Sequence, residues 1–562
     1  MATPFYQDPP QLTNTYTRDT ALKSHLTRLL DPATLEAITP ELETMGEQAA
    51  GPMIALARQA ETHPPTLTQY GPYGRRIDHI ELSHGWKEIS RIAAAAGLID
   101  IPYARAHGWQ SRVHQAALLH LFTPSSAYVS CPLAMSDGAV AALTTYGGDA
   151  EWATRAIHHL RTRDPDQAWT SGQWMTEKEG GSDVGRSSTT ARFDGQHWRL
   201  YGTKWFTSAT TSECTLGLAR PEGAGAGSRS LALFYIEPWN ADGTSNHIRV
   251  RRLKDKLGTK ALPTAELDLE GAVAHPVGDV TEPGLRKIAT VLNIARYFNA
   301  NSAVSFMRRD IDLALAYAQV REAFGHRIID LPLHAETLAD LQVEYEGALA
   351  VGLRLAELLG KVECGVATDI ERATWRLLTP LAKLGTGKQV VHVASETLEA
   401  FGGAGYIEDT DIPRLLRDAQ VLPIWEGTTN VLSLDALRAI ERENALEGFM
   451  ADIAALTHGL DQGPLAKQAA LVDQARGQLG QYALSMARGG DAVAIQLGAR
   501  RFALSLYRTY AAALLCRHAA WDRQTTGSQR SSHVAARWIA GGLTSIASFD
   551  ASRVAENLEL LG

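Results

Sequence analysis

The spacing of apolar residues along the chain changes twice, and each change predicts a different kind of element. Up to about residue 172, apolar residues recur at helical spacing with loop breaks, as in "SHGWKEISRIAAAA", which begins with a plausible helix cap at Ser83. The preceding stretch, "HPPTLTQYGPYGRRIDHIEL", is rich in Pro and Gly, so we expect a loop there. Near Trp174 the pattern becomes alternating in "SSTTARFDGQHWRLYGTKWFTS", which predicts strands with a hairpin turn at Asp194 and Gly195.

Helical spacing returns at about residue 286. Five apolar residues then form one stripe at spacings of three, four, four and three: Val304, Met307, Ile311, Leu315 and Ala318. Three further long helices are predicted within residues 334–359, 372–401 and 431–444, and four such helices suggest a bundle. A short joint, "ALTHGLDQGPLA", precedes more helical sequence.

These patterns predict a mainly α fold with a β insert. The expected order is an N-terminal helical domain at residues 1–172, a middle β-barrel or sandwich domain at 173–285, a four-helix bundle at 286–445 and an extra C-terminal helical domain at 446–562. A chain of 562 residues is longer than one hydrophobic core ordinarily serves, which agrees with several domains.

Composition narrows the class of protein. Hydrophobic content of 45% with 21% charged residues is typical of soluble globular proteins, and no apolar run is long enough to span a bilayer. The first residues do not resemble a secretory signal, and the four widely spaced cysteines indicate reduced thiols, so we expect a cytoplasmic protein without a zinc site. The net charge of −8 gives no global reason to expect nucleic acid, although a local basic patch remains compatible with it.

The segment "VLPIWEGTTN", residues 421–430, places one carboxylate, Glu426, between an apolar run and a polar turn. A lone Glu is usually a solvated surface residue, but residues 422–425 all favour burial. Glu426 is therefore either paired for structural reasons or a buried base.

Two segments near the start of the β region offer polar groups. In "WMTEKEGGSDVG", Thr176 and Ser182 supply hydroxyls and the paired glycines allow close approach of a ligand, although an isolated polar turn has the same appearance. In "GTKWFTS", strand alternation predicts Phe206 and Ser208 on one face and Trp205 on the other. Such a face suits a flat heteroaromatic ring, but from this stretch alone an ordinary aromatic of a β core is the favoured interpretation.

Two further segments follow predicted helices. Arg321 in "REAFG" either satisfies the carboxyl end of a helix or binds a phosphate. The Gly-Gly-x-Gly sequence in "EAFGGAGYIED" indicates a tight approach point, and alone it is weak evidence.

Taken in order, these motifs resemble the acyl-CoA dehydrogenase family of flavoproteins. The matching stretches are "MTEKEGGSD", "GTKWFTS", "KLGTKALPTAEL", "RxxFG" and "GGAGY…RLLRDAQ…IWEGTTN", and the resemblance extends to about residue 440. It implies a helical domain, a β domain and a four-helix bundle, with FAD as cofactor, an acyl-CoA thioester as substrate and an electron-acceptor flavoprotein as partner.

The resemblance also assigns expected roles to individual residues. It implies cofactor contacts by Met175, Thr176, Ser182, Phe206, Ser208, Arg321, Phe324, Glu399, Gly402, Gly403, Thr428 and Asn430. Met175 and Thr176 match the pyrimidine side of the flavin, and Ser208 the hydroxyl near its N5. Arg321, Phe324 and the two glycines match residues that reach the FAD of a neighbouring subunit, which implies a homotetramer.

Glu426 matches the catalytic base of the family, which removes the proton alpha to the thioester while hydride leaves the beta carbon for flavin N5. A glutamate with an ordinary pKa of about 4.3 is a poor base at neutral pH, and burial raises the pKa. Some family members place the base on the first long bundle helix, where this chain has Ala295 beside Arg296. Pro332 and Glu399 stand where the family commonly has glutamine near the FAD adenine.

The chain resembles most the AidB branch of this family, which belongs to the adaptive response to alkylation damage. The cues are "PPTLTQYGPYGRRID", "RLKDKLG", "FMRR…REAFG", "IWEGTTN" and the added helical tail. That branch implies weak dehydrogenase activity toward short or branched acyl-CoAs and a tail that binds duplex DNA.

From residue 445 onward, eleven basic residues face nine acidic ones. The candidate phosphate contacts are Arg500, Arg501, Arg508, Arg517 and Arg523. This excess of positive charge is modest, and a charged helix face is more often only solvated. Two hypotheses remain at this point: a working dehydrogenase, or a DNA-binding flavoprotein with vestigial catalysis.

Overall fold

A computed structural model describes residues 6–489 and 491–562. The chain forms two compact units. The first contains Met1–Glu43, His107–His120 and Asn299–Gly562, and the second contains Thr44–Ala106 and Leu121–Phe298. Three helices run across these boundaries and contribute to both units: α3 (Pro32–Ala50), α7 (Gln110–Phe122) and α10 (Gly284–Val320).

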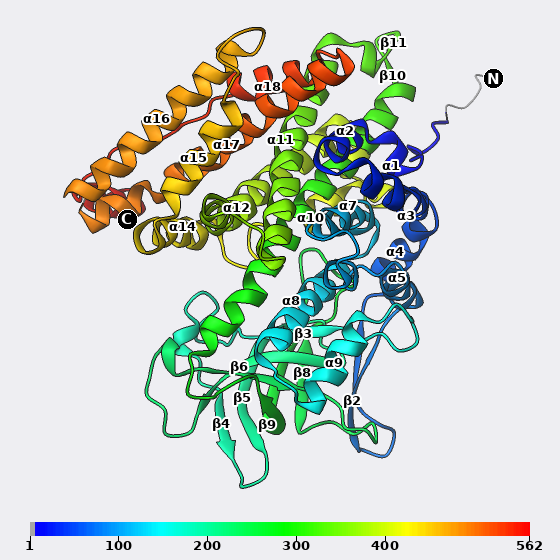
Figure 1. Ribbon diagram of the computed structural model, residues 1–562. Helices are drawn as coiled ribbons and strands as arrows, with labels where there is room; N and C mark the ends of the chain where they lie inside the picture. Colours follow the sequence, from blue (N-terminus) through cyan, green and yellow to red (C-terminus); the bar gives the residue numbers. More distant parts are fainter. Residues whose placement is uncertain (1–5, 490) are drawn as a thin grey trace. The chain divides into compact units, whose positions relative to one another are not determined.

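The second unit contains a seven-stranded sheet that closes on itself (Figure 1). Its strands are β3 (Ser171–Trp174), β4 (Thr190–Phe193), β5 (Trp198–Ser208), β6 (Cys214–Pro221), β7 (Ala232–Ile236), β8 (Ile248–Leu253) and β9 (Thr264–Pro276). They follow the order β3-β6-β4-β5-β9-β7, with β8 paired to β9. Because β7 pairs with β6 as well as β9, the path forms a barrel.

The barrel core consists of apolar side chains from alternate strand positions, among them Trp174, Leu200, Phe234 and Leu267. The turn at Asp194 and Gly195 lies between β4 and β5, as the sequence predicts. The helices of this unit are α4 (Pro52–Thr62), α5 (His84–Ala95), α6 (Ile101–Ala104), α8 (Ser130–Tyr146) and α9 (Glu151–Arg161). Ser83 caps α5, since its Oγ accepts a hydrogen bond from the Trp86 N–H at 3.1 Å.

One prediction for the N-terminal region is wrong. The segment expected as a loop contains an antiparallel hairpin of β1 (Thr66–Tyr70) and β2 (Arg76–Glu81). The Pro and Gly residues lie before the first strand and in the turn between the two strands. The strands themselves contain Thr and Ile residues, which favour strand structure. The Pro and Gly residues thus form a turn, as the sequence predicts, and short strands flank it on both sides.

The first unit contains the four predicted bundle helices. They are the later part of α10, α11 (Pro332–Glu363), α12 (Asp369–Ala400) and α14 (Thr429–Glu443). Of the predicted α10 stripe, every residue is buried except Leu315, which is half-buried. Gly352 of α11 leaves room for the Asn301 side chain of α10, because a Cβ added at Gly352 would lie 2.9 Å from Asn301 Oδ1.

The remaining elements of this unit are mainly helical. They are α1 (Thr15–Arg18), α2 (Thr20–Leu29), α13 (Ile412–Ala419), α15 (Ala445–Thr457), α16 (Ala466–Gly489), α17 (Ala492–Thr526), α18 (Arg530–Ala540) and α19 (Ser552–Leu561), with the two-residue strands β10 (Glu322–Ala323) and β11 (His326–Arg327). Within the described part of the chain, no helix combines the length and apolar character that a membrane crossing requires.

The C-terminal helices pack directly on the bundle. A Cβ at Gly385 of α12 would lie 2.5 Å from the Tyr507 ring, and one at Gly347 of α11 would lie 2.2 Å from the Trp538 ring. Glycine at both positions thus lets large aromatic rings of α17 and α18 contact the bundle backbone. The extra helical segment shares a core with the bundle.

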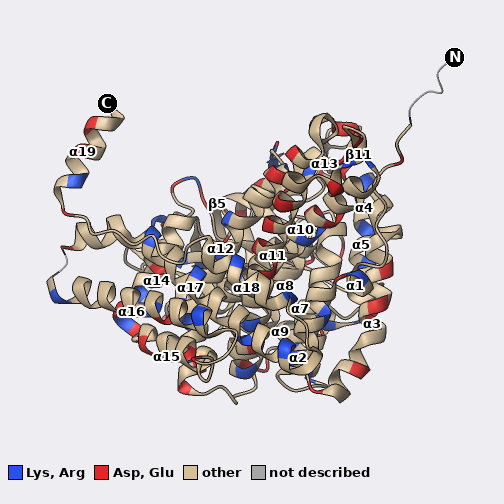
Figure 2. Ribbon diagram, turned by 90° about the horizontal axis from the view of Figure 1, so that it is seen from above, with Lys and Arg blue, Asp and Glu red and all other residues tan. Residues whose placement is uncertain are grey.

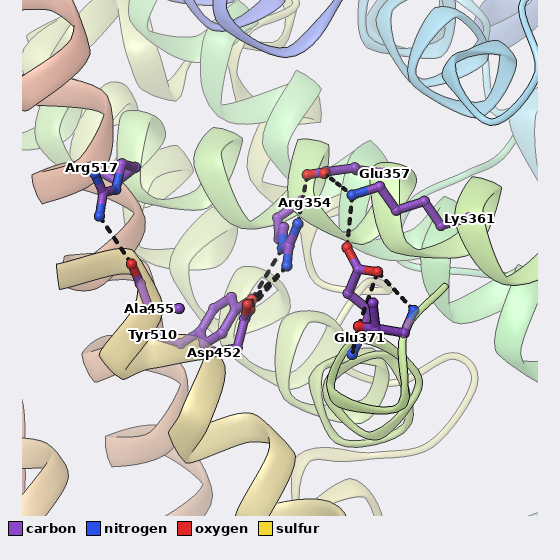
Figure 3. Close-up of polar contacts among 9 residues, drawn as sticks. Arg354, Glu357, Lys361, Glu371, Asp452, Ala455, Tyr510 and Arg517 are labelled. Atoms are coloured by element: carbon purple, nitrogen blue, oxygen red, sulfur yellow. Dashed lines mark hydrogen bonds and ion pairs between the residues drawn. The ribbon is translucent and has the colours of Figure 1, made fainter. Parts of the chain in front are cut away.

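Buried polar contacts also join α15 and α17 to α11 (Figure 3). The Arg354 guanidinium donates to both carboxylate oxygens of Asp452, at 3.0 and 3.1 Å, and the Tyr510 hydroxyl donates to the same carboxylate. Arg517 donates to the Ala455 carbonyl at 2.9 Å near the end of α15, where helix carbonyls lack internal partners.

Candidate active site

The turn that follows β3 is organised around a buried carboxylate, Glu177, which is 2% exposed. Its oxygens accept hydrogen bonds from the hydroxyls of Ser187, Ser188 and Thr189 and from the Ser188 backbone N–H at 2.6 Å. Lys204 of β5 completes the network, because its Nζ lies 2.7 Å from Glu177 Oε1. This cluster ties the turn to β5.

The Glu177 carboxylate is ionised at neutral pH. Burial alone raises its pKa, but the Lys204 ammonium and the surrounding hydroxyl donors outweigh burial and lower the pKa to about 2. Lys204 also donates to the Leu218 carbonyl at 2.8 Å, so the buried ammonium has a second acceptor. A buried ion pair with these additional partners fixes the geometry of the turn.

Three predicted cofactor contacts lie along this turn. Met175 and Thr176 are half-buried and Ser182 is exposed. The Thr176 carbonyl accepts the Trp205 N–H at 2.9 Å, so the structure brings the first and second polar motifs side by side. The glycine at 180 serves the turn itself, because a Cβ there would lie 2.3 Å from a backbone carbonyl of the same loop.

The predicted strand alternation fails in the middle of β5. The pairing register with β9 shifts between Lys204 and Thr207, and both of these side chains are buried. Phe206 is 53% exposed, whereas Ser208 is half-buried with its Oγ 3.2 Å from a neighbouring Thr hydroxyl. An exposed aromatic ring and a half-buried hydroxyl nevertheless lie two residues apart on this strand.

Glu426 lies in the first unit, in the turn before α14. Its side chain is half-buried, with Oε2 shielded from solvent, and its backbone has a left-handed φ of 55°, followed by Gly427 at 107°. A non-glycine residue in this conformation costs of order 1–3 kcal/mol and often marks a functional position. Lys383 of α12 fixes the turn, since its Nζ donates to the Gly427 carbonyl at 2.7 Å.

The apolar run before Glu426 is less buried than the sequence predicts. Leu422 is buried and packs with the following proline against α12 at Gly387, but Ile424 is 59% exposed. The proline and the tryptophan of this run are half-buried, so full burial is limited to Leu422. The expectation that all four residues are buried is wrong.

Thr428 and Asn430 lie at the beginning of α14. Thr428 is its N-cap and is exposed, and its hydroxyl does not cap the helix. Asn430 is exposed and accepts a hydrogen bond from Arg500 at 3.4 Å. The first turn of a helix presents backbone N–H groups and a positive dipole end, which suit a phosphate.

A second group of predicted contacts lies where α10 and α12 end. The rings of Tyr317 and Phe401 stack there at 4.5 Å, which brings the two helix ends together. Arg321 follows α10 directly, and Phe324 forms the tip of the β10–β11 hairpin with 92% of its surface exposed and a left-handed φ of 54°. A bulky apolar side chain held outward on a strained turn is suited to contact another molecule.

The Gly-Gly-x-Gly segment lies in the same region. Glu399, Gly402 and Gly403 are exposed, and added Cβ atoms at the two glycines would meet nothing within 4 Å. The tight approach is instead at Gly405, where a Cβ would lie 2.0 Å from the Leu398 carbonyl oxygen. The two exposed glycines leave an open backbone surface.

The five candidate DNA-binding arginines do not form one free set. Arg508 donates to the Gly542 carbonyl at 2.8 Å and stacks on a Trp ring, and Arg517 donates to three carbonyls around the end of α15. Arg500 and Arg501 are exposed, and Arg523 is half-buried. Basic and acidic residues are interspersed along the helices in Figure 2.

The sequence pattern did not single out Glu177, Lys204 or Lys383. Each is a charged residue within or near a recognised motif, and each is buried. The sequence feature that could have indicated their burial is a charged residue inside an otherwise apolar or glycine-rich motif. Its pairing could not be inferred, because the partners are distant in sequence.

The two units each present groups that suit a flavin nucleotide. The second unit gathers an exposed aromatic ring and several hydroxyls on adjoining segments, and the first presents a carboxylate, an exposed helix N-terminus and an open glycine backbone. Aromatic packing, hydroxyl donors and oriented N–H groups are what an isoalloxazine and its phosphates require. The described residues hold no group of three or more His, Cys, Asp or Glu side chains that could bind a metal.

Comparison with known families accounts for nearly the whole chain. Four family models match: the adaptive response protein AidB N-terminal domain at 7–167, the acyl-CoA dehydrogenase middle domain at 172–272, the acyl-CoA dehydrogenase C-terminal domain at 282–441, and the acyl-CoA dehydrogenase 11 C-terminal domain-like family at 444–561. Acyl-CoA dehydrogenase family member 11 of Caenorhabditis elegans is 42% identical over 530 residues, covering 92% of this chain and 86% of the relative. The chain belongs to the acyl-CoA dehydrogenase family.

Other acyl-CoA dehydrogenase relatives agree with this assignment. The putative acyl-CoA dehydrogenase AidB of Escherichia coli is 30% identical over 77% of this chain and 81% of its own length. The crystal structure of Caenorhabditis elegans ACDH-11 in complex with C11-CoA has a TM-score of 0.96 at 40% identity, covering 100% of this chain and 97% of that one. The predicted acyl-CoA dehydrogenase fold, with its added C-terminal helices, is confirmed.

Proposed function

We propose that this protein is an FAD-dependent acyl-CoA dehydrogenase in which Glu426 is the catalytic base. The observation that carries the proposal is the placement of Glu426: a half-buried carboxylate on a left-handed turn, at the N-terminus of a long helix, in a chain of this family. The alternative base position is apolar, since Ala295 is 3% exposed within α10.

Glu426 removes the proton from the carbon alpha to the thioester. The strained turn holds the carboxylate in place before substrate arrives, and Lys383 restrains the backbone of the same turn from the side of α12. When bound, FAD supplies the acceptor for the hydride that leaves the beta carbon. Removal of both hydrogens gives the enoyl-CoA product.

We propose FAD contacts by Met175, Thr176, Ser182, Phe206 and Ser208, which lie on the barrel or in the turn after β3. The family resemblance supports Thr428 and Asn430, at the start of α14, as further cofactor contacts. The Glu177–Lys204 pair acts on this site indirectly, because it fixes the backbone that carries Thr176 and precedes Phe206.

We infer a homotetramer in which Arg321, Phe324, Gly402 and Gly403 reach the cofactor of a neighbouring subunit, with Glu399 beside the glycines. The exposed Phe324 at the hairpin tip supports this assignment. Phe324→Ala should weaken assembly without unfolding the subunit, which sedimentation velocity would measure. Unchanged assembly and unchanged FAD retention would remove Phe324 from the interface.

The decisive experiment is anaerobic titration of the purified yellow protein with acyl-CoA thioesters, following loss of flavin absorbance. The series should include short, branched and C11 chains, because the AidB resemblance favours short or branched substrates whereas ACDH-11 of Caenorhabditis elegans was crystallised with C11-CoA. We expect at least one thioester to bleach the flavin. A colourless protein, or a flavin that no thioester reduces, would contradict the proposed activity.

DNA binding is the second candidate function, supported by the AidB-type N-terminal domain and by the exposed Arg500 and Arg501. Against it stand the internal contacts of Arg508 and Arg517. If several arginines bind phosphates, affinity for duplex DNA should fall steeply as salt rises. Absence of binding at low salt would eliminate this function while leaving the dehydrogenase proposal intact.

A further inference from the structure

The C-terminal helix α19 has no buried residue, although its sequence is amphipathic. Val554, Leu558 and Leu561 form one apolar stripe at spacings of four and three, and they are 38%, 63% and 83% exposed. Figure 2 shows α19 extending away from α14 and α16 of the same unit. Because a helix of ten residues is marginal in water by itself, this stripe requires a covering surface.

A second apolar surface of this unit is only partly covered. It is the end of the α16–α17 hairpin, residues 480–489 and 491–497, which we call the α16–α17 tip. None of these described residues is buried. The buried stripe of α16 ends at Leu479, and its continuation at Tyr482 and Met486 is only half-buried. The exposed large apolar side chains of the tip are Leu484 and Val493.

The chain that leads to α19 runs along α16 toward this tip. The Thr544 hydroxyl donates to Gln478 Oε1 at 3.2 Å, and farther along both segments the Tyr482 hydroxyl donates to the Ala547 carbonyl at 3.3 Å. Helix α19 begins shortly after this second contact, at Ser552. It therefore starts beside the α16–α17 tip of its own chain, yet its apolar stripe is exposed.

The end of the α16–α17 hairpin and α19 carry opposite net charges. Residues 480–501 contain three basic residues and one acidic residue: Arg488, Arg500, Arg501 and Asp491. Residues 552–562 contain two acidic residues and one basic residue: Glu556, Glu559 and Arg553. Because like charges repel, the acidic α19 does not fit nucleic acid or an anionic membrane, whereas it complements the basic end of the α16–α17 hairpin.

We propose that α19 of one subunit covers the α16–α17 tip of a second copy of this chain, and that the second copy covers the tip of the first in the same way. Each copy presents one exposed apolar helix and one partly covered tip of opposite charge, so a two-fold contact covers all four surfaces. Residues 543–550, which form no helix or strand, connect α18 to α19 and allow this exchange. No residue of the tip or of α19 is among those assigned to the flavin, to proton removal or to the contact at Phe324.

Hydrogen exchange of the α19 amides in the full-length FAD-loaded protein tests whether the helix is covered. In the wild-type protein these amides should exchange at least about tenfold more slowly than in Leu558→Asp, which places a charge in the apolar stripe. Leu560→Asp is the matched control and should keep wild-type protection, because residues two apart on a helix point to nearly opposite sides. Both side chains are exposed within their own subunit, so both variants should fold. Equal exchange in the wild type and Leu558→Asp, or equal loss of protection in the two variants, would overturn the proposal.

A second pair of variants identifies the surface that α19 covers. Val493→Asp on the α16–α17 tip should remove the protection of the α19 amides. Leu471→Asp should not, because Leu471 is similarly exposed but lies on α16 outside the tip, at 38% compared with 40% for Val493. Equal protection of α19 in these two variants would place the helix elsewhere and would overturn the proposal.

Co-expression of Leu558→Asp and Val493→Asp chains distinguishes a second copy from the same chain. Each variant alone lacks one of the two surfaces, but a mixed pair joins the intact α19 of the Val493→Asp chain to the intact tip of the Leu558→Asp chain. The α19 peptides of the two chains differ in mass, so their exchange is measured separately. The intact α19 should regain its protection in the mixed pairs. No recovery would show that α19 lies on its own chain or is uncovered, and either result would overturn the proposal.

Discussion

Replacement of Glu177 by Gln should destabilise the barrel locally and strongly. The pKa of Glu177 falls from 4.5 to about 2 on folding, which by linkage corresponds to about 3 kcal/mol of stability at neutral pH. Because the shift is downward, this stability is present above pH 4.5 and is lost as the pH falls toward 2. The variant also leaves the Lys204 ammonium buried without its carboxylate, which typically costs about 3–5 kcal/mol.

Hydrogen exchange of amides in β3 to β6 measures this cost directly. A loss of about 3 kcal/mol should accelerate exchange of the protected amides by more than about 100-fold, and FAD retention should fall with it. Glu222→Gln is the control, because Glu222 forms an exposed ion pair with Arg192 in the same region, and such pairs contribute about 0–1 kcal/mol. If Glu177→Gln exchanges no faster than this control, the buried pair does not hold the turn.

Two further predictions concern the first unit. Burial lowers the pKa of His518 to about 3 and that of the stacked His25 well below 6.5. The unfolded chain therefore binds protons that the folded chain excludes, and the free energy of unfolding should fall by about 1.4 kcal/mol per residue for each pH unit below 6.5. Equal urea midpoints at pH 7 and pH 5.5 would refute this. Gly347→Ala should lower the free energy of unfolding by about 1–3 kcal/mol, because its Cβ would meet the Trp538 ring at 2.2 Å. The control is Gly477→Ala on α16, where the added Cβ meets nothing within 4 Å and should not destabilise the protein. Equal urea midpoints for the two variants would show that α18 is not packed on the bundle.

Much of the fold follows from local pattern. The α10 stripe, the Ser83 cap and the turn at Asp194 and Gly195 all depend on residues close in sequence, and all three appear in the structure. The β1–β2 hairpin was missed because its strands are short and half-exposed, so their apolar alternation is weak. Its stability comes from contacts with β8, about 170–180 residues away along the chain.

The candidate site could be predicted in identity but not in geometry. Glu426, Phe206 and Phe324 were singled out by motif, yet their backbone conformations and exposures depend on a register shift and on left-handed turns. The sequence does not reveal the left-handed backbone at Glu426 and Phe324, because these two residues are not glycines themselves. The Glu177–Lys204 pair was inaccessible because it joins residues that only the tertiary fold brings together.

The most direct test of the central claim is the rate of flavin reduction by acyl-CoA in Glu426→Gln under anaerobic single-turnover conditions. A positioned general base contributes about 10²–10⁴-fold, so reduction should slow by at least about 100-fold while the FAD content stays unchanged. Glu441→Gln, at an exposed position near the end of α14, should reduce its flavin at the wild-type rate. Wild-type reduction by Glu426→Gln would contradict the assignment of Glu426 as the base.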